Sequence, residues 1–292
     1  MNAVDVVPNG TSRRSSLLRR KGRSAWIFTP VAWAVAAFNL AVLAWMVLGS
    51  LKTTRELMFQ PFALPKTLQW RNYADAWDVG GFGQGVFNSL FLVFVSGVGC
   101  ILVSAPAAYA LSRFRSRWAP SMTLMFVMGL GIPHQTLFIP LYLAFYRLGL
   151  VDSIFGLALL YTGTGVPFAV FLLTAFFRNL PDELEEAAAL DGAGPWLTFW
   201  RIMLPQARSG LVTIFVLQAI GHWGETLFAL VMLQTKSTVS LAMYQFAQTM
   251  QYTGGRYSVL FAGLTIVVLP LFVIYLVLGK RIVDGMAAGY SR

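Results

Sequence analysis

Acidic side chains gather in one short segment of this sequence. Five of its twelve aspartates and glutamates fall within residues 182–191. Carboxylates at this density can bind a cation or form ion pairs with arginines of another surface. The sequence has no metal-ligand pattern, phosphate-binding loop or nucleophilic serine motif. We therefore expect ion pairing with a partner, and no metal, cofactor or catalytic residue in this chain.

The elements that position these residues are predicted to be membrane helices. Of the 292 residues, 57% are hydrophobic and 12% are charged. A soluble fold of this length could not bury so much apolar surface. The net charge of +10 then indicates loops held on the cytoplasmic side, and not a nucleic-acid partner. The single cysteine, Cys100, excludes an intrachain disulfide.

Six apolar segments have the length of about 20 residues that a spanning helix requires. They are residues 25–50, 86–111, 121–146, 154–177, 210–233 and 259–278. Three prolines interrupt the third and fourth segments, namely Pro133, Pro140 and Pro167. Such breaks either shape a cavity or only bend a packed helix, and both alternatives stay open. The predicted fold is an all-α integral membrane protein with six transmembrane helices.

The distribution of basic residues predicts the orientation in the membrane. The amino terminus, the loops 112–120 and 178–209 and the carboxyl tail carry 15 of the 22 lysines and arginines. Cytoplasmic loops carry the excess of these residues, so both termini are expected inside. The expected parts are a disordered basic tail (1–24), a transmembrane domain (25–279) containing the acidic loop, and a cytoplasmic tail (280–292).

The acidic loop predicts two short helices around a turn. Pro181 fits a first helical turn, and Gly192 is the natural end of that helix because glycine adopts the left-handed conformation freely. Pro195 starts a second helix, whose apolar stripe at helical spacing is Trp196, Phe199, Trp200 and Met203. The stripe is expected against the membrane helices, with Glu186 of the first helix facing a partner's arginine. A solvated connector is the alternative.

The loop also resembles a known motif. Glu186-Ala187-Ala188, then Gly192, nine residues and Ile202-Met203-Leu204-Pro205 is similar to the EAA loop of binding-protein-dependent ABC importer permeases. Residues 88–114, 132–159 and 279–290 resemble the shorter six-span subunit of the carbohydrate-uptake, maltose-type branch. The chain ends in Tyr-Ser-Arg and not in that branch's common Val-Lys-Gly, which leaves a tail contact with the ATPase open.

The resemblance implies a type I ABC importer permease fold in the bacterial inner membrane, forming half of a translocation pore. It implies four kinds of partner: a second homologous permease, two ATP-binding cassette subunits that carry the ATPase activity, an extracytoplasmic solute-binding protein and a carbohydrate substrate. The ATPase-docking residues carried over to this chain are Glu186, Ala187, Ala188, Asp191 and Gly192. Those expected to position the second arm are Ile202, Leu204 and Pro205.

Four residues in the apolar segments are candidates for the substrate path. Ionisable groups inside a membrane are costly and often functional, which singles out Glu225, His134 and His222. Trp223 could stack on a sugar ring. The family commonly has Trp-Asn-x-Phe where this chain has Trp-Gly-Glu-Thr-Leu from Trp223. The alternatives are a structural pair of Glu225 with His222 or the partner permease, and ordinary packing of the others.

Other functions stay open at this stage. Importer permeases for polyamines, amino acids or phosphate-containing solutes share the EAA loop. A secondary transporter would show two repeats with matching broken helices, and none is visible. A membrane enzyme would need a catalytic cluster at one depth, for which two histidines and one carboxylate are few.

Overall fold

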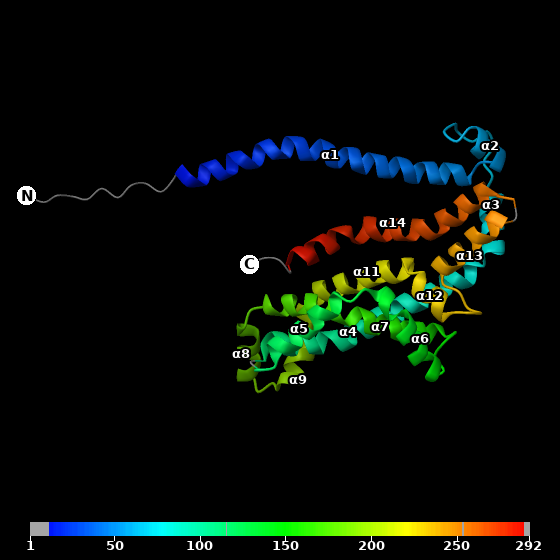
Figure 1. Cartoon of the computed structure of the whole chain (residues 1–292). Helices are drawn as coiled ribbons and strands as arrows, with labels where there is room; N and C mark the ends of the chain where they lie inside the picture. The colour runs from blue at the N-terminus through cyan, green and yellow to red at the C-terminus, as the bar shows by residue number, and fades with distance from the viewer. Residues whose placement is uncertain (1–11, 115, 253, 289–292) are drawn as a thin grey trace, which may run out of the picture.

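The computed structural model describes the backbone of residues 12–114, 116–252 and 254–288, and side chains between residues 29 and 280. Every regular element in these residues is helical. Four helices are single and apolar enough to cross a membrane: α1 (Ser12–Ser50), α4 (Phe82–Arg113), α7 (Ile154–Arg178) and α14 (Tyr257–Ala288). They run lengthwise through the molecule (Figure 1).

Two bent assemblies complete the membrane part. The helix α5 (Ala119–Leu130) meets η1 (His134–Leu137) and α6 (Phe138–Arg147) at 93°. A segment of α9 (Pro195–Thr198), η2 (Phe199–Met203) and α10 (Leu204–Gln206) meets α11 (Arg208–Gly224) at 70°. Up to six membrane crossings result, as the hydropathy of the sequence predicts, and the all-α class is confirmed.

The expected proline breaks are found at one position of three. Pro133 has an extended backbone and separates α5 from η1. Pro140, in contrast, lies in the first turn of α6, where a missing N–H costs little. Pro167 lies inside α7, which continues through it. The prediction that Pro140 and Pro167 interrupt their helices was therefore wrong.

The fifth predicted span, residues 210–233, is not one helix. The helix α11 stops at Gly224, Glu225 is extended with ψ 126°, and a short helix α12 (Leu227–Met232) follows. The hydropathy average of the sequence conceals this break because the residues around it are apolar. The break brings Glu225 into the candidate site described below.

The predicted terminal parts overlap the long helices. The helix α1 begins at Ser12, within the predicted tail, and α14 extends to Ala288, beyond the predicted boundary at 279. Residues 1–11 and 289–292 lie outside the described part of the chain. The helical boundaries are thus wider at both ends than hydropathy alone suggests.

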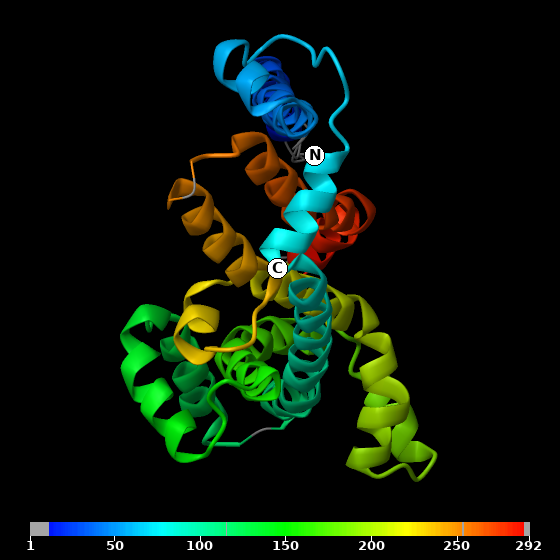
Figure 2. The same ribbon diagram turned by 90° about the vertical axis from the view of Figure 1, so that its right-hand side faces the viewer.

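The core forms where α4 packs along α7 and α11 crosses both. Small and apolar residues fill this contact, and Leu92, Leu157 and Ile214 are fully buried. The helix α1 packs mainly on α14, and none of its apolar window is buried. Three short helices lie at the far end from the acidic loop: α2 (Thr54–Phe59), α3 (Arg71–Gly80) and α13 (Val239–Tyr252). The molecule seen from that end is shown in Figure 2.

Candidate functional site: the acidic loop and the break in the fifth span

The acidic loop forms the helix α8 (Glu183–Leu190) at one end of the molecule (Figure 1). The helix begins two residues after Pro181, and it ends at Leu190, two residues before Gly192, whose φ is +78°. The Ala193 N–H donates to the Ala188 carbonyl at 2.9 Å, and the Gly192 N–H donates to that of Ala189 at 3.0 Å. These two bonds form a Schellman motif, which requires a left-handed residue at Gly192.

Two of the five carboxylates bind within the chain. The Arg113 side chain, only 8% exposed at the end of α4, pairs with Asp182 and lies 3.3 Å from a Glu185 oxygen. The same guanidinium donates to the Leu180 carbonyl at 2.6 Å. One turn earlier on α4, the Tyr109 hydroxyl donates to Glu185 at 2.5 Å. This anchor was not predicted, although Arg113 stands in the loop 112–120, which is predicted on the same side of the membrane.

The residues that the family resemblance assigns to ATPase docking differ in exposure. Glu186, Ala187, Asp191 and Gly192 are exposed on α8 and its turn, whereas Ala188 is 2% exposed. The Ala188 methyl group therefore packs against this chain and is not offered to a partner. The outer surface of α8 carries small side chains and carboxylates, with the exposed Leu190 at its end.

The second arm is less regular than its spacing predicts. Pro195 opens α9 as expected, but the chain then widens into the π-helical turn η2. Phe199 and Met203 are buried, whereas Trp196 is 67% and Trp200 40% exposed. The expected stripe of four packed side chains was therefore wrong for the two tryptophans. Trp200 lies in the π-helical turn, which shifts it from the helix positions of period 3.6, whereas Trp196 precedes that turn in α9.

The remaining residues of the second arm lie at its junction with α11. Ile202 and Leu204 are half-buried against the cluster formed by α4, α7 and α11. Pro205 is exposed in the short helix α10. The arm is thus fixed to the membrane helices on one side.

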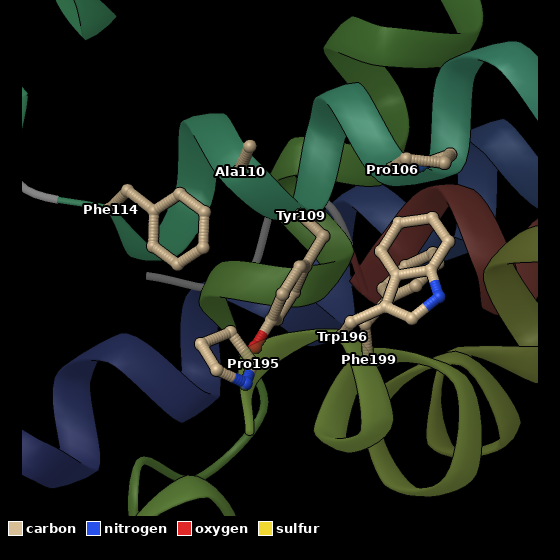
Figure 3. Close-up of a pocket in the computed structure, with 7 residues that line it drawn as sticks. All are labelled: Pro106, Tyr109, Ala110, Phe114, Pro195, Trp196 and Phe199. Atoms are coloured by element: carbon tan, nitrogen blue, oxygen red, sulfur yellow. The ribbon is translucent and has the colours of Figure 1, made fainter.

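A cavity of about 300 Å³ lies between the end of α4 and the second arm (Figure 3). Its walls are Pro106, Tyr109, Ala110, Phe114, Pro195, Trp196 and Phe199. Tyr109 projects from α4 toward Pro195, and its ring lies 5.1 Å from that of Phe199. Through its ring and its hydroxyl, Tyr109 contacts both the second arm and α8.

Around the break in the fifth span, Glu225 acts as a helix cap. One carboxyl oxygen accepts from the Phe228 N–H at 2.8 Å, and the other accepts from the Ala229 N–H at 3.3 Å. The Tyr161 hydroxyl of α7 also donates to Glu225. A break at membrane depth frees backbone donors, and this side chain satisfies two of them.

His222 is not the partner of Glu225, so that predicted pair was wrong. The buried His222 ring stacks on Tyr161 at 4.6 Å, and its Nδ1 lies 2.8 Å from the Ser96 hydroxyl. Tyr161 therefore stands between the two residues. Nothing in the sequence marked it, because aromatic residues are frequent in all the apolar segments.

The other two candidates lie apart from this cluster. Trp223 is 4% exposed, and its indole N–H donates to the Val267 carbonyl of α14 at 3.0 Å, which is a packing contact. His134 is exposed in η1, with its ring 6.3 Å from that of Phe228. The break at Pro133 and the break at Glu225 are thus brought together by the contact of His134 with Phe228. No group of residues suited to hold a metal ion occurs in the described part of the chain.

The sequence is similar to known membrane transport proteins. Residues 100–287 match the family model "Binding-protein-dependent transport system inner membrane component". The chain is 32% identical to the diacetylchitobiose uptake system permease protein NgcG of Streptomyces coelicolor, covering 90% of this chain and 86% of that protein. It is 31% identical to the trehalose transport system permease protein SugB of Mycobacterium tuberculosis, covering 87% and 93%.

A solved structure shares the fold. It is a bacterial ABC transporter involved in the import of the acidic polysaccharide alginate, with a TM-score of 0.73 and 24% identity over 88% of this chain and 97% of that one. The family match covers more than half of the sequence, and the relatives are similar over most of their length. The chain belongs to the family of binding-protein-dependent transport system inner membrane components.

Proposed function

We propose that this chain is the permease subunit of an ATP-driven importer and forms half of the pore for a sugar or oligosaccharide. The substrate class is supported by the relatives named for uptake of diacetylchitobiose and trehalose. A non-sugar solute is the alternative.

The observation that supports coupling to an ATPase is that α8 is bound to this chain on one side and exposed on the other. Its inner side is fixed to α4 by Arg113 and Tyr109, and its outer side presents the exposed Glu186, Ala187 and Asp191. A carboxylate at an interface gives register with a partner's arginine. The proposed partner is an ATP-binding cassette subunit, which places α8 and both termini in the cytoplasm. The ATPase activity resides in that subunit and not in this chain.

The proposed mechanism follows from these contacts. Nucleotide binding closes the two ATPase subunits and displaces α8. Arg113 and Tyr109 carry the displacement to α4, while the second arm carries it through Ile202 and Leu204 to α11. The pore, completed by a second permease, then switches between inward-facing and outward-facing states. An extracytoplasmic binding protein delivers the solute.

In this proposal the substrate path includes Glu225 and His134, the two candidates that keep exposed surface. His222 and Trp223, both buried, shape the helices around the path. Glu225 has first a structural role, because its oxygens already accept three hydrogen bonds.

The test is purification of this chain with its native partners in mild detergent. We expect a second permease and an ATPase to co-purify. Gly192→Asp, which places a charge and a strained φ at the exposed turn, should remove the ATPase and retain membrane insertion. Gly194→Asp is the matched control, because Gly194 is equally open but has an ordinary φ of −72°. Wild-type recovery of the ATPase with Gly192→Asp would contradict the docking assignment.

The substrate class has its own test. ATP hydrolysis by the reconstituted complex is measured with the associated binding protein loaded with diacetylchitobiose, trehalose or an amino acid. We expect stimulation by a carbohydrate. Stimulation by the amino acid alone would favour the non-sugar alternative and leave the ATPase-docking result untouched.

A further inference from the structure

The segment after α1 folds back beside the last turns of that helix. The Trp45 indole N–H donates to the Pro61 carbonyl at 2.9 Å, and the Trp45 ring lies 6.2 Å from that of Phe62. Trp45 precedes the end of α1 by five residues, which corresponds to about 7.5 Å along the helix axis. Phe62 therefore lies at the depth of the apolar span Thr29–Ser50 and not beyond it. The return is visible where α2 lies over the end of α1 (Figure 1).

A buried lysine fixes this return. Lys52 is 1% exposed, and its ammonium group donates to the carbonyls of Gln60 at 3.1 Å and Pro61 at 2.8 Å. Irregular backbone at membrane depth requires donors from the protein, because lipid provides none. Lys52 and Trp45 together supply them at the point where the chain turns back.

The returning segment exposes large apolar side chains. We call residues 58–70 the hook; its exposed apolar side chains are Met58, Phe59, Phe62, Leu64, Leu68 and Trp70. Phe62 is 88% exposed, although the structure holds its backbone in place. Soluble surfaces rarely carry such contiguous apolar patches unless something covers them.

We propose that the hook inserts into the lipid leaflet at this end of the molecule and packs on phospholipid acyl chains. The hook continues the surface of α1, whose apolar window has no buried residue and needs the same apolar surroundings. The exposed Arg55 and Arg71 flank the hook, and the exposed Lys66 lies within it. Long basic side chains reach headgroups from such positions, and aromatic residues are enriched at this level of a membrane.

The test places a spin label on the hook of the complete transporter in phosphatidylethanolamine–phosphatidylglycerol nanodiscs. The label is attached to Phe62→Cys in a Cys100→Ala background. Collision with oxygen, which concentrates in lipid, is compared with collision with a water-soluble nickel chelate. Phe38→Cys, on the exposed face of α1, and Lys236→Cys, in an exposed loop, are the lipid and water references.

We expect the Phe62 label to match the Phe38 reference, with oxygen favoured severalfold over nickel. Protection from both reagents would show that another protein subunit covers the hook and would overturn the proposal. Nickel accessibility equal to that of Lys236 would place the hook in water and also overturn it.

A second variant tests the anchor. Lys52→Met removes the donors to Gln60 and Pro61, so the Phe62 label should shift toward nickel accessibility. Lys236→Met, at an exposed position outside the hook, is the matched control and should leave the label in lipid. Unchanged accessibility of the label in Lys52→Met would show that this lysine does not hold the hook in place. The accessibility of the label with native Lys52 decides whether the hook lies in lipid.

Discussion

Two carboxylate-bearing regions of this chain, α8 and the break in the fifth span, are built in opposite ways. At α8, Arg113 and Tyr109 bind Asp182 and Glu185, whereas Glu186 and Asp191 are exposed. At the break in the fifth span, both oxygens of Glu225 already accept hydrogen bonds from the chain itself. The difference shows that a carboxylate's place in the sequence does not by itself make it a ligand-binding group. It can bind a partner or solute only where its oxygens are not already occupied by hydrogen bonds within the chain.

Removing the anchor of α8 should have the largest effect. In Arg113→Ala, Asp182 and Glu185 lose their cation, so α8 no longer moves with α4, and we expect uptake into proteoliposomes to fall at least tenfold. Arg113→Lys should recover only part of it, because an ammonium group cannot reproduce the planar contacts of a guanidinium. Arg201→Ala, at an exposed position of the second arm, is the control. Wild-type uptake by Arg113→Ala would show that the ion pairs of Asp182 and Glu185 do not couple α8 to α4.

The cap at the break is expected to matter next. Glu225→Ala leaves the N–H groups of Phe228 and Ala229 without an acceptor, at a cost of about 1–3 kcal/mol. The melting temperature of the purified complex should fall, and Glu225→Gln, which keeps one acceptor oxygen, should fall less. If Glu225 served only the solute, both variants would melt like the wild type and change only the KM for uptake.

Tyr161→Phe sharpens the same comparison with a smaller change. The variant loses the hydrogen bond to Glu225 but keeps the ring that stacks on His222 at 4.6 Å. We expect a loss of about 0.5–1.5 kcal/mol. Combined with Glu225→Ala, the loss should be less than additive, because both changes remove one contact. Strict additivity in the melting temperatures would show that the contact contributes nothing.

The smallest effect is expected at another carboxylate, Asp152, at the opposite end from α8. Its oxygens accept from the Thr235 hydroxyl and from the N–H groups of Thr235 and Gln234, both at 2.9 Å. These bonds hold the pKa of Asp152 well below its ordinary value. A depressed pKa contributes stability above the ordinary value of about 3.9 and loses it as the pH falls through the folded pKa.

The stability difference between wild type and Asp152→Asn should therefore stay constant from pH 8 to pH 5 and shrink only in stronger acid. Melting temperatures across this range measure it. A difference that disappears near pH 6 would contradict the role of the ionised Asp152.

The sequence predicts those helices and helix ends that are determined by residues close together in the chain. Long apolar segments become the long helices, and Gly192 ends α8 because its φ of +78° suits glycine. The break at Glu225 could not be predicted in this way. Hydropathy is averaged over a window, and Tyr161, which binds the Glu225 carboxylate, is 64 positions away in the sequence. The ion pair of Arg113 with Asp182 could not be predicted either, because the two residues are 69 positions apart. Pro167 shows the reverse: a local breaker inside α7, which remains continuous.

The nearly unburied α1 has a consequence for how the chain is assembled. A helix whose apolar window contributes nothing to the interior derives its stability from the bilayer and can insert as an independent step before the rest associates. A break introduced between α1 and α3 should then divide the chain into two fragments that insert separately. Their recombination would depend on the contact of α1 with α14, in which the Trp45 and Phe261 rings lie 5.2 Å apart.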